Sequence, residues 1–191
     1  MKQYVCWLTF SLLMLVAANS SATTLMKLTD DELVQRAEYV IAGHVDRIET
    51  RLERNDTPFQ YITINVTKVL KQNDSSPLLQ NDKVAIRQIG GKVGETTLVV
   101  DGLAQFVENE DVVVCLEQDT NTGLFYVVGN SQGMFHMVNN ELINDTTDGT
   151  MFARKGANGE IVFAGGEVKK TTISSIKNKI EKAADNEEEA R

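Results

Sequence analysis

Alternation of apolar and polar side chains is the main pattern in this chain, and it predicts β-strands joined by turns. Residues 61–70 alternate in this way, which is typical of a strand with one buried face. Residues 111–117 form an apolar run of the kind found in a central strand. Further strands are expected at residues 39–49, 83–89, 96–100, 124–128 and 133–138. This regular spacing predicts a mainly β domain, built as a barrel or a sandwich. The apolar positions of the two strongest strands predict six core residues: Ile62, Ile64, Val66, Val112, Val114 and Leu116.

A helical pattern stands near each end of the chain. Thr29 and Glu32 have the spacing of a capping box, which predicts a short helix over residues 30–38. Isoleucines at positions 173, 176 and 180 share one helical face, which predicts a helix over residues 172–184. The acidic residues 185–191 that follow are expected to be frayed.

Glycine and asparagine mark the predicted turns. Residues 90–94, GGKVG, are expected to form a loop, and Asp101-Gly102 has the composition of a hairpin turn. Residues 121–123 are expected to turn the chain between two strands. Beyond Asn139 the pattern weakens, and it supports only small strands in the segments ELI and EIVF.

Residues 1–22 have the composition of a secretory signal peptide. Lys2 is their only charged residue, and an apolar run from Cys6 to Ala18 follows it. That run is shorter than the roughly 20 residues needed to span a bilayer as a helix. Because Ser20 and Ala22 are small, cleavage is expected after Ala22. The protein is therefore expected to be exported, to a periplasm or to the outside of the cell.

Cleavage would leave a mature chain that begins Thr23-Thr24 and has an acidic composition. We expect a β-barrel domain over residues 23–138 and a C-terminal extension over residues 139–191, packed on the same domain. The formal net charge is −8 for the whole chain, and it becomes −9 when Lys2 is removed. This charge argues against nucleic acid as a partner and against binding to anionic membranes after cleavage.

Residues 129–133, GNSQG, match the G-x-S-x-G pattern of a hydrolase nucleophile elbow around Ser131. That elbow needs a helix after the serine, but a strand is expected there instead. It also needs an acid and then a histidine later in the chain, and His136 is the only later histidine. The segment is therefore interpreted as a turn between strands, with a small serine hydrolase kept as an alternative.

The remaining reactive side chains predict neither a metal site nor a cofactor. Because Cys6 leaves with the signal peptide, Cys115 has no disulfide partner and is expected to be a buried apolar residue. His44 and Asp46 could share a strand face, but a catalytic zinc usually takes three protein ligands. His44 is therefore expected to be a half-exposed strand residue.

Several segments resemble a known family. They are the strand AEYVIAGHVDRIE, the partner strand ending in VTKVLK, the pattern F-x-x-x-E-x-V-V-V-x-L from Phe106 to Leu116, and the segment YVVG. Over residues 29–138 the chain resembles netrin-like domains and the tissue inhibitors of metalloproteinases, and also a group of short secreted bacterial proteins without assigned activity. This resemblance implies a five-stranded OB-type β-barrel, with the short N-terminal helix and the C-terminal helix added to it.

In those inhibitors, an N-terminal cysteine held by a disulfide presents its α-amine and carbonyl to the protease zinc. Here Thr23 and Thr24 would stand at that end without a disulfide, so residues 23–28 are expected to be mobile. The function predicted from the sequence is an exported, non-catalytic binding module with a protein partner. An exported metalloprotease is one candidate partner, with Thr23 and Thr24 as the candidate contacts. A structural envelope component is the other alternative.

Overall fold

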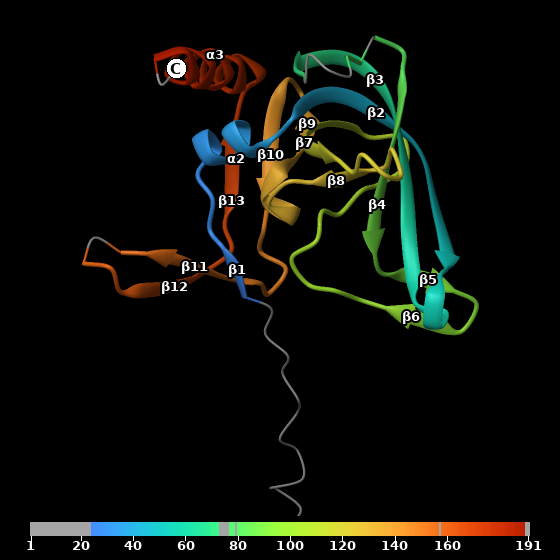
Figure 1. Cartoon of the computed structure of the whole chain (residues 1–191). Helices are drawn as coiled ribbons and strands as arrows, with labels where there is room; N and C mark the ends of the chain where they lie inside the picture. Colours follow the sequence, from blue (N-terminus) through green and yellow to red (C-terminus); the bar gives the residue numbers. More distant parts are fainter. Residues whose placement is uncertain (1–23, 73–76, 79, 157, 190–191) are drawn as a thin grey trace, which may run out of the picture.

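Two long antiparallel strands, β2 (Tyr39–Leu52) and β3 (Pro58–Lys71), form a curved ribbon along one side of the molecule (Figure 1). They belong to a computed structural model that describes residues 24–72, 77–78, 80–156 and 158–189. The expected signal peptide, the cleavage point after Ala22 and residue Thr23 lie outside the described residues. The structure is mainly β, which confirms the predicted class.

A ring of strands surrounds the main hydrophobic core. It comprises β2, β3, β4 (Lys83–Ile89), β8 (Phe125–Val127) and β7 (Asp111–Gln118), and β7 pairs again with β2. All of these pairs are antiparallel except β4 with β8, which meet in parallel at Ile86 and Phe125. The six predicted core residues are buried inside this ring, so their assignment is confirmed.

The same sheet continues beyond the ring through β9 (Met134–Val138), β10 (Glu141–Asp145) and β13 (Val168–Thr171). A second apolar cluster joins this sheet to the two helices, α2 (Asp30–Arg36) and α3 (Ile173–Glu189). Leu33 and Val34 of α2 and Ile176 of α3 are buried in it. Both helices lie side by side at one end of the sheet (Figure 1).

Two small sheets complete the fold. One is the hairpin of β5 (Gly91–Val93) and β6 (Thr96–Leu98). The other has the order β1 (Thr24–Met26), β11 (Met151–Lys155), β12 (Ile161–Gly165). Figure 1 shows that the β11–β12 hairpin extends away from the ring of strands. Among the described helices, neither has the length and apolar composition needed to span a bilayer.

The local helix signals are confirmed, but the predicted ends are not. Thr29 caps α2 in a complete capping box. The backbone N–H of Glu32 donates to the Thr29 hydroxyl, and the backbone N–H of Thr29 donates to the Glu32 carboxylate. The helix ends at Arg36, two residues before the predicted end. The second helix continues to Glu189, so the prediction of a frayed segment from residue 185 is wrong for residues 185–189.

Three predictions between the strands are corrected. Residues 91–93 of the expected GGKVG loop form strand β5. Asp101-Gly102 is a turn, but among the described strands β6 pairs with β5 alone, so this turn does not join two neighbouring strands. Beyond Asn139 the expected small strands are present, and β11 and β13 were missed because each is short and has mixed composition.

Candidate functional site

The N-terminal segment is held against the body of the protein, contrary to the expected mobility of residues 23–28. β1 pairs in parallel with β11, with Thr24 opposite Met151 and Met26 opposite Ala153. The side-chain amide of Gln132 holds the next residues: it accepts from the Leu28 N–H at 2.8 Å and donates to the Met26 carbonyl at 3.0 Å. The prediction is therefore wrong for residues 24–28, and Thr23 itself lies outside the described residues. Thr24 is exposed at the start of β1.

Gln132 is positioned by a short 3-10 turn, η2 (Asn130–Gly133). Gly129 begins this turn with φ 70°, a left-handed conformation that glycine adopts without strain. A Cβ at Gly129 would lie 2.7 Å from the Cδ2 of Leu33 and 3.0 Å from the Cδ1 of Leu28. The turn can therefore pack closely against α2 and the N-terminal segment only with glycine at this position.

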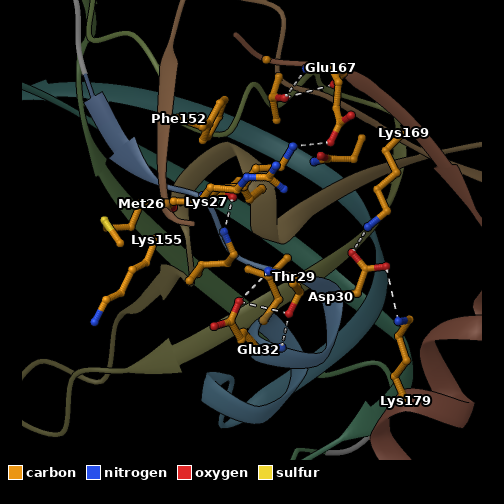
Figure 2. Close-up of a pocket in the computed structure, with 17 residues that line it drawn as sticks. Met26, Lys27, Thr29, Asp30, Glu32, Phe152, Lys155, Glu167, Lys169 and Lys179 are labelled. Carbon is orange, nitrogen blue, oxygen red and sulfur yellow. Dashed lines mark hydrogen bonds and ion pairs between the residues drawn. The ribbon is translucent and has the colours of Figure 1, made fainter. Parts of the chain in front are cut away.

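A cleft of about 560 Å³ lies beside this anchored segment (Figure 2). It is bounded by the start of α2, by β10 and β11, and by the residues that lead into β13, with Lys179 of α3 at one side. A more open hollow of about 590 Å³ lies against other parts of the same segment and shares Met26, Leu28 and Gln132 with the cleft. The segment therefore contributes to both concave surfaces.

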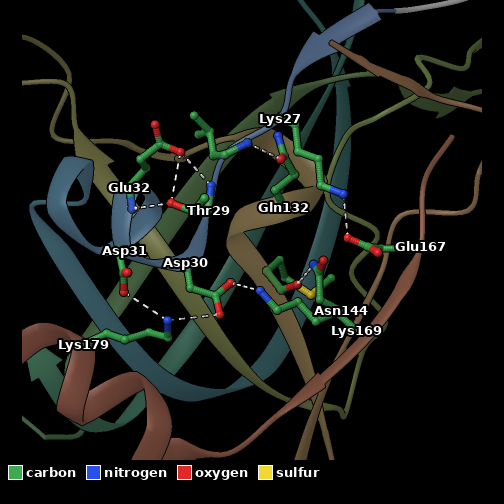
Figure 3. A network of polar contacts seen from close by, with 12 residues as sticks. Lys27, Thr29, Asp30, Asp31, Glu32, Gln132, Asn144, Glu167, Lys169 and Lys179 are labelled. Carbon is green, nitrogen blue, oxygen red and sulfur yellow. Dashed lines mark hydrogen bonds and ion pairs between the residues drawn. The ribbon is translucent and has the colours of Figure 1, made fainter. Parts of the chain in front are cut away.

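Ion pairs cross the cleft and connect distant parts of the chain (Figure 3). Asp30, which is only 8% exposed, contacts the ammonium groups of Lys169 and Lys179. Lys179 also bonds to Asp31 at 3.0 Å, and this contact lowers the pKa of the Asp31 carboxyl group. Lys27 bonds to Glu167 at 2.7 Å and lowers the pKa of that carboxyl group. These pairs fix α2, β13 and α3 around the cleft.

Positive charge exceeds negative charge along the cleft although the chain as a whole is acidic. Five cationic residues line it against three acidic ones: Lys27, Arg154, Lys155, Lys169 and Lys179 against Asp30, Glu32 and Glu167. Within the part of the chain that the structure describes, no ion pair involves the side chains of Arg154 and Lys155 on β11. In Figure 2 the side chain of Lys155 points away from the bonded network. β11 therefore carries two cations that have no ion-pair partner in the described structure.

The neighbouring strand β12 is apolar and exposed along its whole length. Its five residues, Ile161–Gly165, carry no charge, and every one of them is exposed. The exposed fractions are 54% for Ile161 and 57% for Phe163, and Met26 on β1 reaches 59%. In the described structure, four of the ten large hydrophobic residues that are exposed belong to this small sheet. The strand predicted at EIVF is confirmed as β12. Its exposure does not follow from the sequence pattern, because it depends on how the whole hairpin packs.

Ser131 lies in η2 on the inner side of the same region. It is 6% exposed, and its hydroxyl has no hydrogen-bond partner within the described residues. Its backbone is held on both sides, because its N–H donates to the Gly102 carbonyl and its carbonyl accepts from Asn144. The ring of His136 bonds instead to Glu110 at 2.8 Å. A 3-10 turn and then strand β9 follow the serine, in place of the helix that a nucleophile elbow needs.

The other reactive side chains lie on strands β2 and β7. Cys115 is buried as predicted, and burial raises the pKa of its thiol to about 12. His44 is half-buried as predicted and bonds to Asp111 at 2.9 Å, while Asp46 bonds to Lys83. Among the described side chains, no group of three or more histidine, cysteine or acidic residues has a geometry that could hold a metal ion.

Comparison with known proteins adds no relative to this picture. A scan against protein-family models gives no match, and searches of the curated proteins and of the solved structures likewise give none. The resemblance to netrin-like domains and metalloproteinase inhibitors therefore stays a prediction from the sequence.

Proposed function

We propose that this protein is an exported, non-catalytic binding module whose partner is another protein. The observation that carries this proposal is the exposure of Ile161, Val162 and Phe163 on a strand at the edge of a sheet. Soluble proteins usually protect such edges with charges, prolines or bulges, and an unprotected apolar edge is typical of an interaction surface. The cleft beside it adds a concave surface with positive charge.

The surroundings of Ser131 support a binding role rather than the hydrolase alternative. A nucleophilic serine needs a general base within hydrogen-bond reach, and the hydroxyl of Ser131 is buried without any such contact in the described structure. The only histidine that follows it in the chain is bonded to Glu110. Burial of Ser131 in a turn that positions Gln132 gives this segment a structural role.

The ring of five strands supports the OB-type, netrin-like fold that the sequence resemblance implies. A parallel contact between β4 and β8 closes that ring. OB-type barrels bind diverse ligands, so the fold by itself assigns no partner. An exported metalloprotease remains a second candidate partner, and one observation favours it: β1 is anchored without a disulfide, so the mature N-terminus would leave the body from a fixed strand.

The binding proposal is tested by capture of partners from the exported fraction, followed by mass spectrometry. The wild-type protein is compared with Phe163→Ser and with Val99→Ser, since both side chains are exposed, at 57% and 79%. We expect one set of partners to be lost with Phe163→Ser and retained with Val99→Ser. Absence of any specific partner would favour a structural envelope component, and labelling of Ser131 by a fluorophosphonate probe would favour the hydrolase.

A further inference from the structure

We propose that the free edge of β12 is a strand-addition site for an extended, acidic segment of the partner protein. This inference rests on the proposed binding function and specifies its mode. Main-chain hydrogen bonds to β12 would supply affinity, and Arg154 of β11 would select acidic side chains on its face of the sheet. The occupant is thus defined by two features, an extended backbone and carboxylates at alternate positions.

The backbone of β12 is open on one side. The small sheet has the order β1, β11, β12, so β12 pairs with β11 and, within the described residues, with no other strand. Alternate residues of an edge strand turn their N–H and C=O groups outward, where they can pair with another chain. Neither a proline nor a charged residue interrupts Ile161–Gly165. Figure 1 shows β12 on the outer side of the projecting hairpin, away from the ring of strands.

The register of the small sheet assigns the side chains to two faces. Met26, Ala153 and Phe163 lie opposite one another across the three strands, so they share one face. Met26 and Phe163 are both more than half exposed, with the small Ala153 buried between them, so the two ends of this apolar row are open to solvent. Apolar side chains of an added strand, at every second position, would extend this row beside Phe163.

The other face provides the positive charge. Arg154 lies opposite Val162, on the face turned away from Phe163, and has no ion-pair partner among the described residues. A strand added to β12 would lie about 10 Å from β11, since neighbouring strands are about 4.8 Å apart. A glutamate opposite Val162 would therefore be within reach of the long Arg154 side chain. Lys155, opposite Ile161, lies instead on the face of Phe163, at the end of the hairpin, so Arg154 is the cation that faces the glutamates.

Charge complementarity favours this partner over a second copy of the chain. Two β12 strands paired with each other would bring together uncharged residues and leave Arg154 and Lys155 without acidic partners. An acidic segment from a different protein satisfies both the edge and Arg154.

Binding can be measured with a synthetic peptide that alternates valine and glutamate, acetylated and amidated at its ends. A second peptide carries lysine in place of glutamate. We expect the full mature protein to bind the glutamate peptide, and hydrogen exchange to slow in β12 when it does. The variant Arg154→Glu should weaken that binding by about fivefold and strengthen binding of the lysine peptide. Arg54→Glu, an exposed arginine in the distant turn η1 (Arg54–Asp56), is the matched control and should change neither.

Two N-methylated glutamate peptides test the backbone contacts, one methylated on its valines and the other on its glutamates. In strand addition only one of these two sets of N–H groups faces β12, so one peptide should lose binding and the other should keep it. Equal binding of both, absence of binding by the parent peptide, or protection outside β12 would each overturn the proposal.

A dimer of the wild-type protein in sedimentation that is lost in Val162→Lys would instead assign the edge to a second copy. If the peptide experiment fails while Phe163→Ser still abolishes capture of a partner, the binding function stands and only strand addition is rejected. If the peptide does not bind and Phe163→Ser also leaves capture of partners unchanged, both strand addition and the proposed function are rejected.

Discussion

The backbone N–H of Leu28 donates a hydrogen bond of 2.8 Å to Oε1 of the Gln132 side chain. The same amide donates from Nε2 to the carbonyl of Met26. Gln132 is only 7% exposed, so these bonds are shielded from water. Gln132 therefore positions β1 and the residues that follow it, and its side chain lines both the cleft and the more open hollow.

Gln132→Ala should release this segment. Loss of the amide leaves a part-buried N–H and a part-buried carbonyl without this partner, which should lower the free energy of unfolding by about 1 kcal/mol. Hydrogen exchange should accelerate at residues 24–29. Gln105→Ala, which removes an exposed amide bonded only to a nearby carbonyl, is the matched control and should change neither quantity. Unchanged exchange at residues 24–29 in Gln132→Ala would mean that β-pairing alone holds them.

The capping box predicts a pH dependence. Hydrogen bonds from the backbone and side chain of Thr29 hold the pKa of Glu32 below its ordinary value of 4.5. A carboxyl group whose pKa is lower in the folded state stabilises the protein above that ordinary value, and this stabilisation is lost as the pH falls below it. Glu32→Gln should therefore be less stable than the wild type at pH 7 and should approach it near pH 3, as measured by urea unfolding. Glu95→Gln, in an exposed turn, should show no such convergence.

Ser131→Ala should leave the fold and any biological activity of the protein intact. The hydroxyl has no hydrogen-bond partner in the described structure, so its removal should change the free energy of unfolding by less than about 0.5 kcal/mol. Asn144→Ala is the contrasting variant, since Asn144 donates at 2.6 Å to the carbonyls of both Ser131 and Met134. Loss of these two hydrogen bonds in Asn144→Ala should lower the free energy of unfolding by about 1–3 kcal/mol. A loss of activity in Ser131→Ala without loss of stability would revive the hydrolase alternative.

Val114→Asp should prevent folding. Val114 is fully buried on β7, inside the ring of strands, and an aspartate there would bury a charge without a partner. Circular dichroism should show loss of the β signal at temperatures where the wild type is folded. Val107→Asp is the control because Val107 is 52% exposed, and its melting temperature should stay close to that of the wild type.

The mature N-terminus decides the protease-inhibitor hypothesis. Sequencing of the exported protein should begin at Thr23, and a start beyond Leu25 would contradict the predicted cleavage. If the α-amine of Thr23 binds a protease zinc, one residue added before it should abolish inhibition of an exported zinc protease. Because Thr24–Met26 is already paired with β11, the protease would have to order less of the chain on binding. The loss of affinity from this ordering should therefore be smaller than for a mobile N-terminal segment. Equal potency of the two forms would exclude the amine-to-zinc mechanism.

Features of this protein that depend on neighbouring residues could be predicted from the sequence alone. The capping box of Thr29 and Glu32 joins residues three positions apart, so its bonds follow from the local chain. The strands β3 and β7 and their buried positions follow from apolar patterns within single segments, because each side chain's face is set by its place in the strand.

Only the tertiary structure decided which segments become neighbours. The pairing of Thr24 with Met151 and the bond from Leu28 to Gln132 each join residues more than 100 positions apart. Such contacts depend on how the whole sheet closes, and short strands of mixed composition give no local sign of their partners. The same reason explains why β12 could be predicted as a strand while its exposed edge could not. An apolar segment is buried or exposed according to what packs on it, and the hairpin that carries Phe163 projects from the body of the fold.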